Sequence, residues 1–299
     1  MLALGRYASA IRLDEPFVPL PAPPGVDDAQ ARDEALEWLL REHGQIPASV
    51  PPGTDAGALL RRLLTIRHPG GIPLRVHACL DQVLAARARA RGSAGPDEVT
   101  AGPGPPSSVG GSLLRLWRGD ITRLALDAIV NAANTELLGC FRPGHECIDN
   151  AIHNAAGPRL RDDCATIIDI QGRREDTGDA KITRAYHLPS RFVLHTVGPV
   201  VADGRVRPQD ERALSASYRS CLDLAHSMRS VRTLAFCGVS TGVFGYPKAQ
   251  AAEVAVRTVW SWLSDHPGAL DLVVFNVFSE ADCDAYRTVM GAAGLERDS

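Results

Sequence analysis

The fold is decided by one stretch of the chain, Asn131-Ala-Ala-Asn-Thr-Glu-Leu-Leu-Gly-Cys-Phe-Arg-Pro-Gly-His-Glu-Cys-Ile-Asp-Asn-Ala-Ile-His153. It follows the apolar run 124–130, which is short and rich in branched residues and therefore predicts a buried strand. Its end enters a segment whose apolar residues recur every three or four positions, which predicts a helix over 148–164. The stretch therefore forms a loop between a strand and a helix.

This loop contains three side chains of types that bind metals, all within eight consecutive positions: Cys140, His145 and Cys147. Thiolate and imidazole are preferred ligands of zinc, and three protein ligands with an open fourth position are typical of catalytic zinc. Coincidence and a closed structural zinc site are the alternatives. The nearest fourth ligand, Cys164, lies 17 residues beyond Cys147, roughly 25 Å along a continuous helix. We interpret His153, inside the predicted helix, as a core histidine with satisfied hydrogen bonds.

The composition is that of a soluble globular protein, with 45% hydrophobic and 22% charged residues among 299. A net charge of -3 gives no reason to expect broad binding to nucleic acid or to anionic membranes. The seven cysteines lack secretory spacing, the first residues lack a signal-peptide pattern, and no apolar stretch approaches about 18 residues. We therefore expect a cytoplasmic protein with reduced thiols.

The chain divides into two parts around a segment dominated by Gly, Pro and Ser. Residues 1–91 are expected to be a helical extension, and residues 92–112 a flexible linker that cannot bury enough apolar surface. Arg87, Arg89 and Arg91 form a basic run that is more typical of a solvated helix end than of a binding patch. Apolar periodicity in the extension predicts helices over 27–43, 58–67 and 74–91.

Residues 113–299 alternate between strand and helix patterns, which predicts an α/β domain with helices on both faces of a sheet. Ligands of such sheets bind at the carboxyl ends of the central strands. Strands are expected over 113–117, 128–131, 181–187, 192–197, 233–237 and 272–278. Helices are expected over 148–164, 210–228, 247–263 and 281–291.

A glycine-rich loop, Gly238-Val-Ser-Thr-Gly-Val-Phe-Gly-Tyr-Pro247, is the second informative stretch. It joins a strand to a helix whose first position suits Pro247, so its N–H groups and the helix dipole predict a phosphate site. Phe244 and Tyr246 could stack on a sugar or wall the cleft, although Phe244 also suits core packing. Asp120, after the first strand of the domain, could hold an exocyclic amine, but taken alone it is better interpreted as an N-cap.

These motifs, in this order, resemble those of the macrodomain family, which binds ADP-ribose, and the resemblance covers roughly residues 113–290. Most macrodomains have a run of glycines where this chain has Gly139-Cys-Phe-Arg-Pro-Gly-His-Glu-Cys147. That replacement resembles the zinc-dependent subgroup, which removes ADP-ribose from modified proteins and often carries a helical N-terminal extension. The matching motifs are Arg118-Gly-Asp-Ile-Thr122, Asn131-Ala-Ala-Asn134, Ala151-Ile-His-x-Ala-Ala-Gly157, His195-Thr-Val-Gly-Pro199 and Ser240-Thr-Gly-Val-Phe-Gly-Tyr-Pro247.

The resemblance implies a three-layer α/β/α fold with a mixed sheet of about six strands and ADP-ribose across its top. Asp120 is expected to hold the adenine amine, Ile121 to offer a backbone contact and Phe278 to stack on adenine. Asn134 is expected to face the distal ribose, whereas Asn131 is expected to be structural. The diphosphate is expected to lie in the loop formed by Ser240, Thr241, Gly242, Val243, Phe244, Gly245 and Tyr246.

The expected activity is zinc-dependent hydrolysis of the bond between C1″ of the distal ribose and a protein side chain. Zinc would bind a ribose hydroxyl, a water or both, Asp149 would orient or deprotonate the water, and Phe244 would confine the ribose. Asp149 could instead only stabilise the first turn of its helix. A non-catalytic ADP-ribose reader and an O-acetyl-ADP-ribose deacetylase are the alternatives. The resemblance also suggests a sirtuin-like transferase and a lipoyl-carrying protein as partners.

Overall fold

Strands without exposed positions build the centre of the molecule. The computed structural model describes residues 2–45, 53–101 and 107–292. Every residue of β5 (Phe192–Thr196) and β7 (Leu272–Val277) is buried, and β3 (Ala128–Ala132) is buried except at its last residue. Such uniformly buried strands are typical of parallel sheets that helices cover on both faces.

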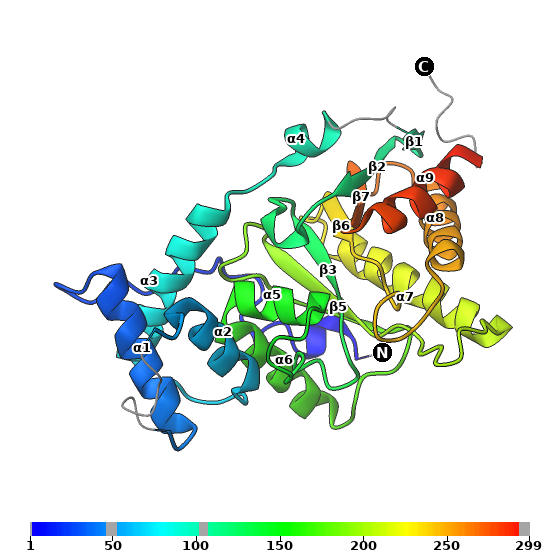
Figure 1. The fold of residues 1–299 in the computed structure, drawn as a ribbon. Coiled ribbons are helices and arrows are strands. Elements are labelled where there is room, and N and C mark those ends of the chain that lie inside the picture. The colour runs from blue at the N-terminus through cyan, green and yellow to red at the C-terminus, as the bar shows by residue number, and fades with distance from the viewer. Residues whose placement is uncertain (1, 46–52, 102–106, 293–299) are drawn as a thin grey trace.

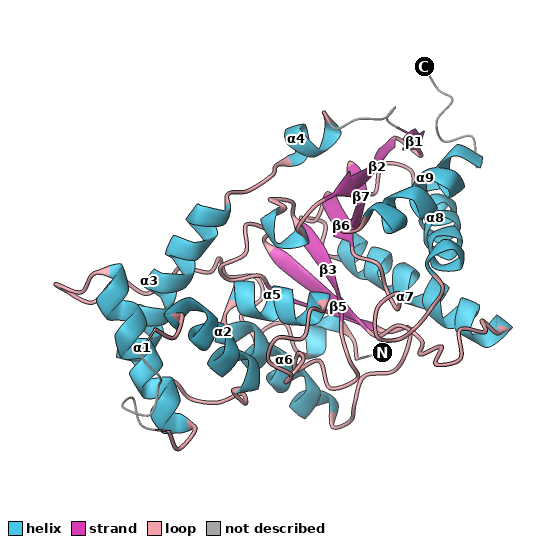
Figure 2. Cartoon of the chain, in the orientation of Figure 1, coloured by secondary structure: helices cyan, strands magenta, loops and turns pink. Residues whose placement is uncertain are grey.

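The described strands form one mixed, seven-stranded sheet (Figures 1 and 2). The central strands β2, β7, β6, β3 and β5 are mutually parallel, whereas β1 and β4 run antiparallel at the two edges. The order across the sheet is β1 (Ser107–Val109), β2 (Ser112–Arg118), β7, β6 (Thr233–Phe236), β3, β5 and β4 (Ala180–Arg184). The prediction of a mixed α/β sheet is confirmed, with β1 as one strand more than the six expected.

Two sets of helices cover the sheet, which gives the predicted α/β/α layers (Figure 2). Helices α7, α8 and α9 pack one against the next, while α5 packs against α6, β3 and the N-terminal helices. These helices are α5 (Ile148–Ala156), α6 (Pro158–Gln171), α7 (Pro208–Ser227), α8 (Lys248–Asp265) and α9 (Glu280–Ala292). None of the helices in the described part of the chain combines the length and apolar character needed to cross a bilayer.

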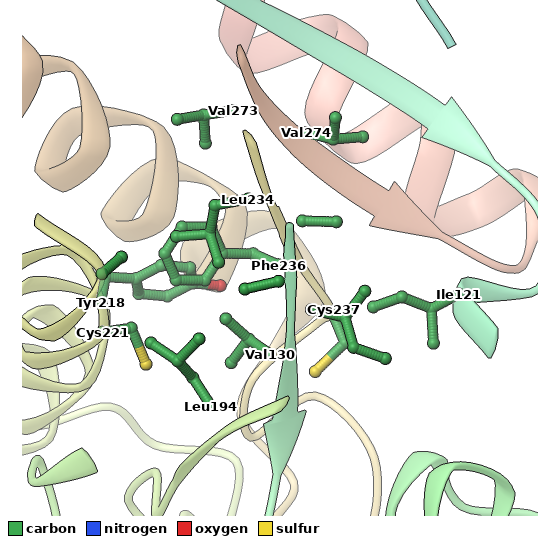
Figure 3. Packing of buried hydrophobic residues seen from close by; sticks show 14 of the residues in the cluster. Ile121, Val130, Leu194, Tyr218, Cys221, Leu234, Phe236, Cys237, Val273 and Val274 are labelled. Atoms are coloured by element: carbon green, nitrogen blue, oxygen red, sulfur yellow. The ribbon is translucent and has the colours of Figure 1, made fainter. Parts of the chain in front are cut away.

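One part of the main core lies between the sheet and α7 (Figure 3). Val130, Leu194 and Phe236 extend from three neighbouring strands and are almost fully buried. They meet Tyr218 and Cys221 of α7, and the rings of Tyr218 and Phe236 lie 4.9 Å apart. Burying each large apolar side chain contributes about 1.5–3 kcal/mol, so this layer contributes a large part of the stability.

The N-terminal helices have a separate apolar core but are bound firmly to the rest. They are α1 (Asp28–Glu42), α2 (Ala56–Ile66) and α3 (Leu74–Arg91), close to their predicted bounds. Residues 4–13 instead pack into the main core, where the Tyr7 hydroxyl accepts a hydrogen bond from Ile182 N at 3.1 Å. The predicted extension 1–91 therefore contains a segment that belongs structurally to the sheet domain.

The prediction of a flexible linker over residues 92–112 is wrong for much of the part that the structure describes. Ala94 bridges to Leu124, α4 (Pro96–Thr100) follows, and β1 pairs with β2. Composition misled the prediction because a few well-placed apolar residues, such as Val99 and Val109, suffice to bury these short elements. Residues 102–106 of this segment lie outside the described residues.

The predicted helix 148–164 is two helices, α5 and α6. Gly157 has φ +92°, a conformation that favours glycine, and Pro158 begins α6 without an N–H to continue the earlier helix. Pro247 is likewise one residue outside its predicted helical position, because it caps α8 and Lys248 begins that helix.

Candidate active site

The three predicted zinc ligands meet in the loop 139–147, which we call the metal loop. Cys140 Sγ lies 3.5 Å from His145 Nδ1, and the ligand atoms of Cys140, His145 and Cys147 all lie within 4.8 Å of one another. Bond lengths of about 2.0–2.3 Å in a tetrahedral zinc site place ligand atoms roughly 3.5 Å apart, so these residues fit such an ion. Asn150 of α5 fixes the loop by donating to Arg142 O and His145 O, both at 3.1 Å.

Cys164 does not belong to this group. Its thiol is buried in the core, 3.7 Å from His195 Nε2, and forms a second cluster with His153 and His195. The four-ligand alternative therefore finds no support from Cys164. Burial and the adjacent Cys140 raise the pKa of the Cys147 thiol to about 11. Metal binding requires that thiol to be ionised, so binding would release a proton.

A buried polar network forms the floor beneath the metal loop. The Asp149 carboxylate is 5% exposed and accepts a hydrogen bond from Asn131 Nδ2 at 2.8 Å. Burial raises the pKa of Asp149 to about 6, and the Asn131 bond and the charge of Arg161 only partly oppose this. The structural role expected for Asn131 agrees with its complete burial. The network thus couples the end of β3 to the first turn of α5.

Two histidines border this network. Burial lowers the pKa of His195 to about 3, so its ring is neutral near neutral pH. Its Nδ1 lies 3.2 Å from Asn131 Nδ2 and its Nε2 lies 3.0 Å from Thr183 Oγ1, which fits a ring that accepts at Nδ1 and donates at Nε2. His153 is also buried, and its Nε2 lies 3.5 Å from Asp149 Oδ1, but within the described residues neither ring nitrogen has a partner in hydrogen-bond geometry. The prediction of a core histidine is therefore confirmed, whereas the prediction that its hydrogen bonds are satisfied is wrong.

A cavity of about 580 Å³, which we call the cleft, opens between the metal loop and the glycine-rich loop. Asn134 lies in its wall, donates to Gly139 O at 2.9 Å and accepts from Glu136 N at 2.9 Å, so its amide also shapes the metal loop. Phe244 is half-buried in the wall and packs against an apolar cluster beneath it. Its side chain thus both walls the cleft and packs against the core. Asp149 borders the same space.

Residues 238–247, the glycine loop, close the other side of the cleft. Among the described residues, no hydrogen-bond partner is recorded for the backbone N–H groups of residues 241–244. The Ser240 hydroxyl is buried and has no partner within that part of the chain either. Unpaired N–H groups and a free hydroxyl at the start of a helix form a site for an anion. The loop therefore has the chemistry of the predicted phosphate site.

The end of the glycine loop points away from the cleft. Tyr246 is 2% exposed and lies in the main core, so the prediction that it walls the cleft is wrong. Gly245 is also absent from the described lining, and its N–H donates to Gly242 O at 3.0 Å. Ser240, Thr241, Gly242, Val243 and Phe244 do line the cleft.

A second cavity of about 1040 Å³, which we call the groove, adjoins the cleft and shares His145, Cys147 and Phe278 with it. Asp120 and the buried Ile121 border the groove. The Asp120 carboxylate accepts from Thr122 N at 2.9 Å, so it acts as a cap while facing this space. Phe278 is 78% exposed, beside both cavities, where an aromatic ring can stack on a planar ligand.

The sequence interpretation missed the opposite wall of the groove, which α2 and α3 form. That wall contains Arg61, Arg62, Arg87 and Arg91. Of the basic run, Arg87 and Arg91 are half-buried against the groove, whereas Arg89 is exposed. Their spacing of four residues places both on one helix face, but it does not show that the rest of the protein covers that face.

Comparison with known proteins agrees with this geometry. The macro domain pattern matches residues 130–255. A protein-ADP-ribose hydrolase of Treponema medium is 43% identical over 260 residues, covering 85% of this chain and 96% of its own. A protein-ADP-ribose hydrolase of Staphylococcus aureus strain MSSA476 is 49% identical over 179 residues, covering 60% of this chain and 66% of its own. A Trypanosoma brucei macrodomain solved with ADP-ribose has a TM-score of 0.58 and 34% identity, covering 77% and 95% of the two chains. The chain therefore belongs to the macrodomain family.

Proposed function

We propose that the protein is a zinc-dependent hydrolase that removes mono-ADP-ribose from modified protein side chains. One observation carries the proposal: two thiols and one imidazole, those of Cys140, Cys147 and His145, converge on the rim of the cleft that the glycine loop closes. A site that only bound ADP-ribose would gain little from a metal beside the ribose. The names of the relatives, and the ADP-ribose bound to the trypanosome macrodomain, also favour this substrate.

The cleft and the adjoining groove together offer a place for each part of the ligand. The free N–H groups of residues 241–244 and the Ser240 hydroxyl would bind the diphosphate. Asp120 and Phe278 would hold adenine at one end, and Asn134 and Phe244 would border the distal ribose at the other. This arrangement would orient the ribose carbon C1″ toward the metal loop, so that the reacting bond is positioned before reaction.

Hydrolysis breaks the bond between C1″ and the protein side chain and forms a bond between C1″ and the oxygen of water. One proton of the water stays on the new hydroxyl and the other ends on the released side chain. Asp149, ionised above its pKa of about 6, would orient or deprotonate the water, while Asn131 holds the carboxylate in place. Zinc held by the metal loop would supply Lewis acidity at this end of the cleft.

The proposal is tested by release of ADP-ribose from a mono-ADP-ribosylated protein. The purified protein is compared with the same sample after chelation and after zinc is restored, with circular dichroism to check folding. We expect loss of release on chelation, recovery with zinc and an unchanged fold. Full release by demonstrably zinc-free protein would contradict the role of the metal, and tight ADP-ribose binding without release would indicate a reader.

A pair of variants separates catalytic from structural zinc. Cys140→Ala removes a ligand, and Cys79→Ala removes a buried thiol in the separate core of the N-terminal helices. We expect the Cys140 variant to stay folded but inactive, and the Cys79 variant to keep zinc and activity. An unfolded Cys140 variant would assign the metal a structural role. Parallel assays with O-acetyl-ADP-ribose show whether the same site also removes an acetyl group.

A further inference from the structure

Four arginines gather on one wall of the groove. Arg61 and Arg62 come from α2, and Arg87 and Arg91 come from α3, so two helices contribute to a single surface. The opposite wall contains α5 and the end of the metal loop, and Figure 1 shows α5 beside α2 and α3. The acidic residues of the described lining are Asp120 and Glu146, so positive charge dominates the groove.

Within the described chain, acidic residues offset only part of the charge of these guanidinium groups. Asp55 acts on Arg61 and Arg87, and Asp120 acts on Arg91. No ion pair within 4.0 Å is recorded there for any of the four, although such pairs are frequent elsewhere on the surface. Arg87 donates to Gly57 O at 3.1 Å, which satisfies one N–H but not its charge. Burial, and then the positive charges of neighbours such as Arg61, lower the pKa of Arg87. Crowded, partly desolvated cations are unfavourable unless an anion joins them.

The wall is held rigidly against the domain that contains the cleft. Asn154 of α5 donates to Thr65 Oγ1 of α2 at 3.0 Å. Arg161 of α6 donates to Leu64 O at 2.9 Å, at the end of α2. The helices that carry the arginines therefore keep a fixed position relative to the metal loop, which limits the positions that the guanidinium groups can reach.

We propose that the groove binds an acidic polypeptide segment of the modified protein and thereby brings its ADP-ribosylated side chain to the metal loop. The inference rests on the proposed function. Guanidinium groups bind carboxylates with paired hydrogen bonds, so a row of arginines suits a run of Asp or Glu. In the proposed function adenine takes the end of the groove beside Asp120 and Phe278, and the diphosphate takes the glycine loop, so neither is assigned to the wall of α2 and α3. The groove meets the cleft at His145 and Cys147, near which the protein end of the substrate must lie.

The test uses two synthetic peptides with one ADP-ribosylated side chain, one flanked by four glutamates and the other by four glutamines. The variant Arg61→Glu with Arg62→Glu reverses two exposed charges of the wall. Its matched control is Arg212→Glu with Arg219→Glu, which reverses two exposed charges on α7, outside both cavities. Circular dichroism and the affinity for free ADP-ribose show that fold and cleft are intact in each protein.

Binding is measured first, by fluorescence anisotropy with labelled peptides, because it does not depend on hydrolysis. We expect the wild type and the control to bind the glutamate peptide about tenfold more tightly than the glutamine peptide, and 0.5 M salt to remove this preference. The wall variant is expected to lose the preference and to keep its ADP-ribose affinity. The value of kcat/KM is expected to follow the same pattern.

Three results would overturn the inference. They are equal binding of the two peptides by the wild type, an unchanged preference in the wall variant, and a single-stranded oligonucleotide that binds the groove more tightly than the glutamate peptide. The proposed function fails in a different way, through absence of hydrolysis of either peptide. In that case the binding preference still decides whether the groove selects acidic segments.

Discussion

Asp81→Asn is the substitution that best tests how the N-terminal helices are attached. Asp81 lies in α3, is 1% exposed and accepts hydrogen bonds from Leu20 N at 2.8 Å and from His187 Nε2 at 2.9 Å. It also pairs with Arg159 of α6, whose second nitrogen lies 3.0 Å away. One buried carboxylate thus joins the extension to two elements of the macrodomain.

The magnitude follows from the protonation of this carboxylate. Burial alone would raise the pKa of Asp81, but the hydrogen bonds from His187, Arg159 and Leu20 outweigh it and lower the pKa from 3.8 to about 2. A depression of this size corresponds to about 2 kcal/mol of stability at neutral pH, once screening around the partly exposed Arg159 is included. Asparagine keeps a hydrogen-bond acceptor but not the charge. We therefore expect Asp81→Asn to lower the free energy of unfolding by about 2–3 kcal/mol.

The pH dependence gives the prediction its sharpest form. The pKa of the folded state lies below that of the unfolded state, so the stabilisation is complete above about pH 4 and disappears as the pH falls toward 2. At pH 3 roughly half of it remains. Urea denaturation of wild type and variant at pH 6 and pH 3 measures this difference directly.

The control is Asp33→Asn, whose side chain is 64% exposed, and which is expected to change the unfolding free energy by less than about 0.5 kcal/mol at either pH. An Asp81→Asn loss of the same size at pH 6 and pH 3 would refute the reasoning. The loss would then come from packing rather than from charge.

Two further substitutions test the cleft. Asp149→Asn removes the charge that the proposed reaction uses while keeping the size of the side chain, so we expect hydrolysis to fall by about 100-fold or more. ADP-ribose affinity, measured by calorimetry, is expected to change little, and undiminished hydrolysis would leave Asp149 a structural role only. Gly245→Ala places a Cβ 2.7 Å from Val201 O at φ +72°. We expect the free energy of unfolding to fall by about 1–3 kcal/mol and ADP-ribose binding to weaken. If urea denaturation shows the same stability for the variant and the wild type, the predicted backbone strain at this position is wrong.

The metal loop could be predicted from the sequence because its ligands are local. Cys140, His145 and Cys147 lie within eight positions, and a strand and a helix at either end limit where the loop can go. The same holds for the glycine loop, in which strand, turn and helix follow directly along the chain. Local order along the chain thus predicted the two sides of the cleft.

Other features depend on contacts between distant segments, which no local pattern shows. Tyr246 carries a polar hydroxyl and lies near the end of the glycine loop, yet its side chain packs into the core. His153 shows the opposite error, because burial was expected to bring hydrogen-bond partners and its nitrogens have none among the described residues. Whether a polar group finds a partner depends on elements far apart in sequence, here α5, α6 and β5.

The four arginines of the groove wall show most clearly that the role of the N-terminal helices depends on how these helices pack against the rest of the protein. On α3 alone, Arg87 and Arg91 are indistinguishable from a solvated helix end, because spacing cannot show which face another domain covers. Docking through Asp81, Asn154 and Arg161 turns that face toward the groove. If Asp81→Asn loosens this docking, it should also reduce the preference for the glutamate peptide without changing ADP-ribose affinity. A change in both would mean that the extension supports the cleft itself and not only the surface beside it.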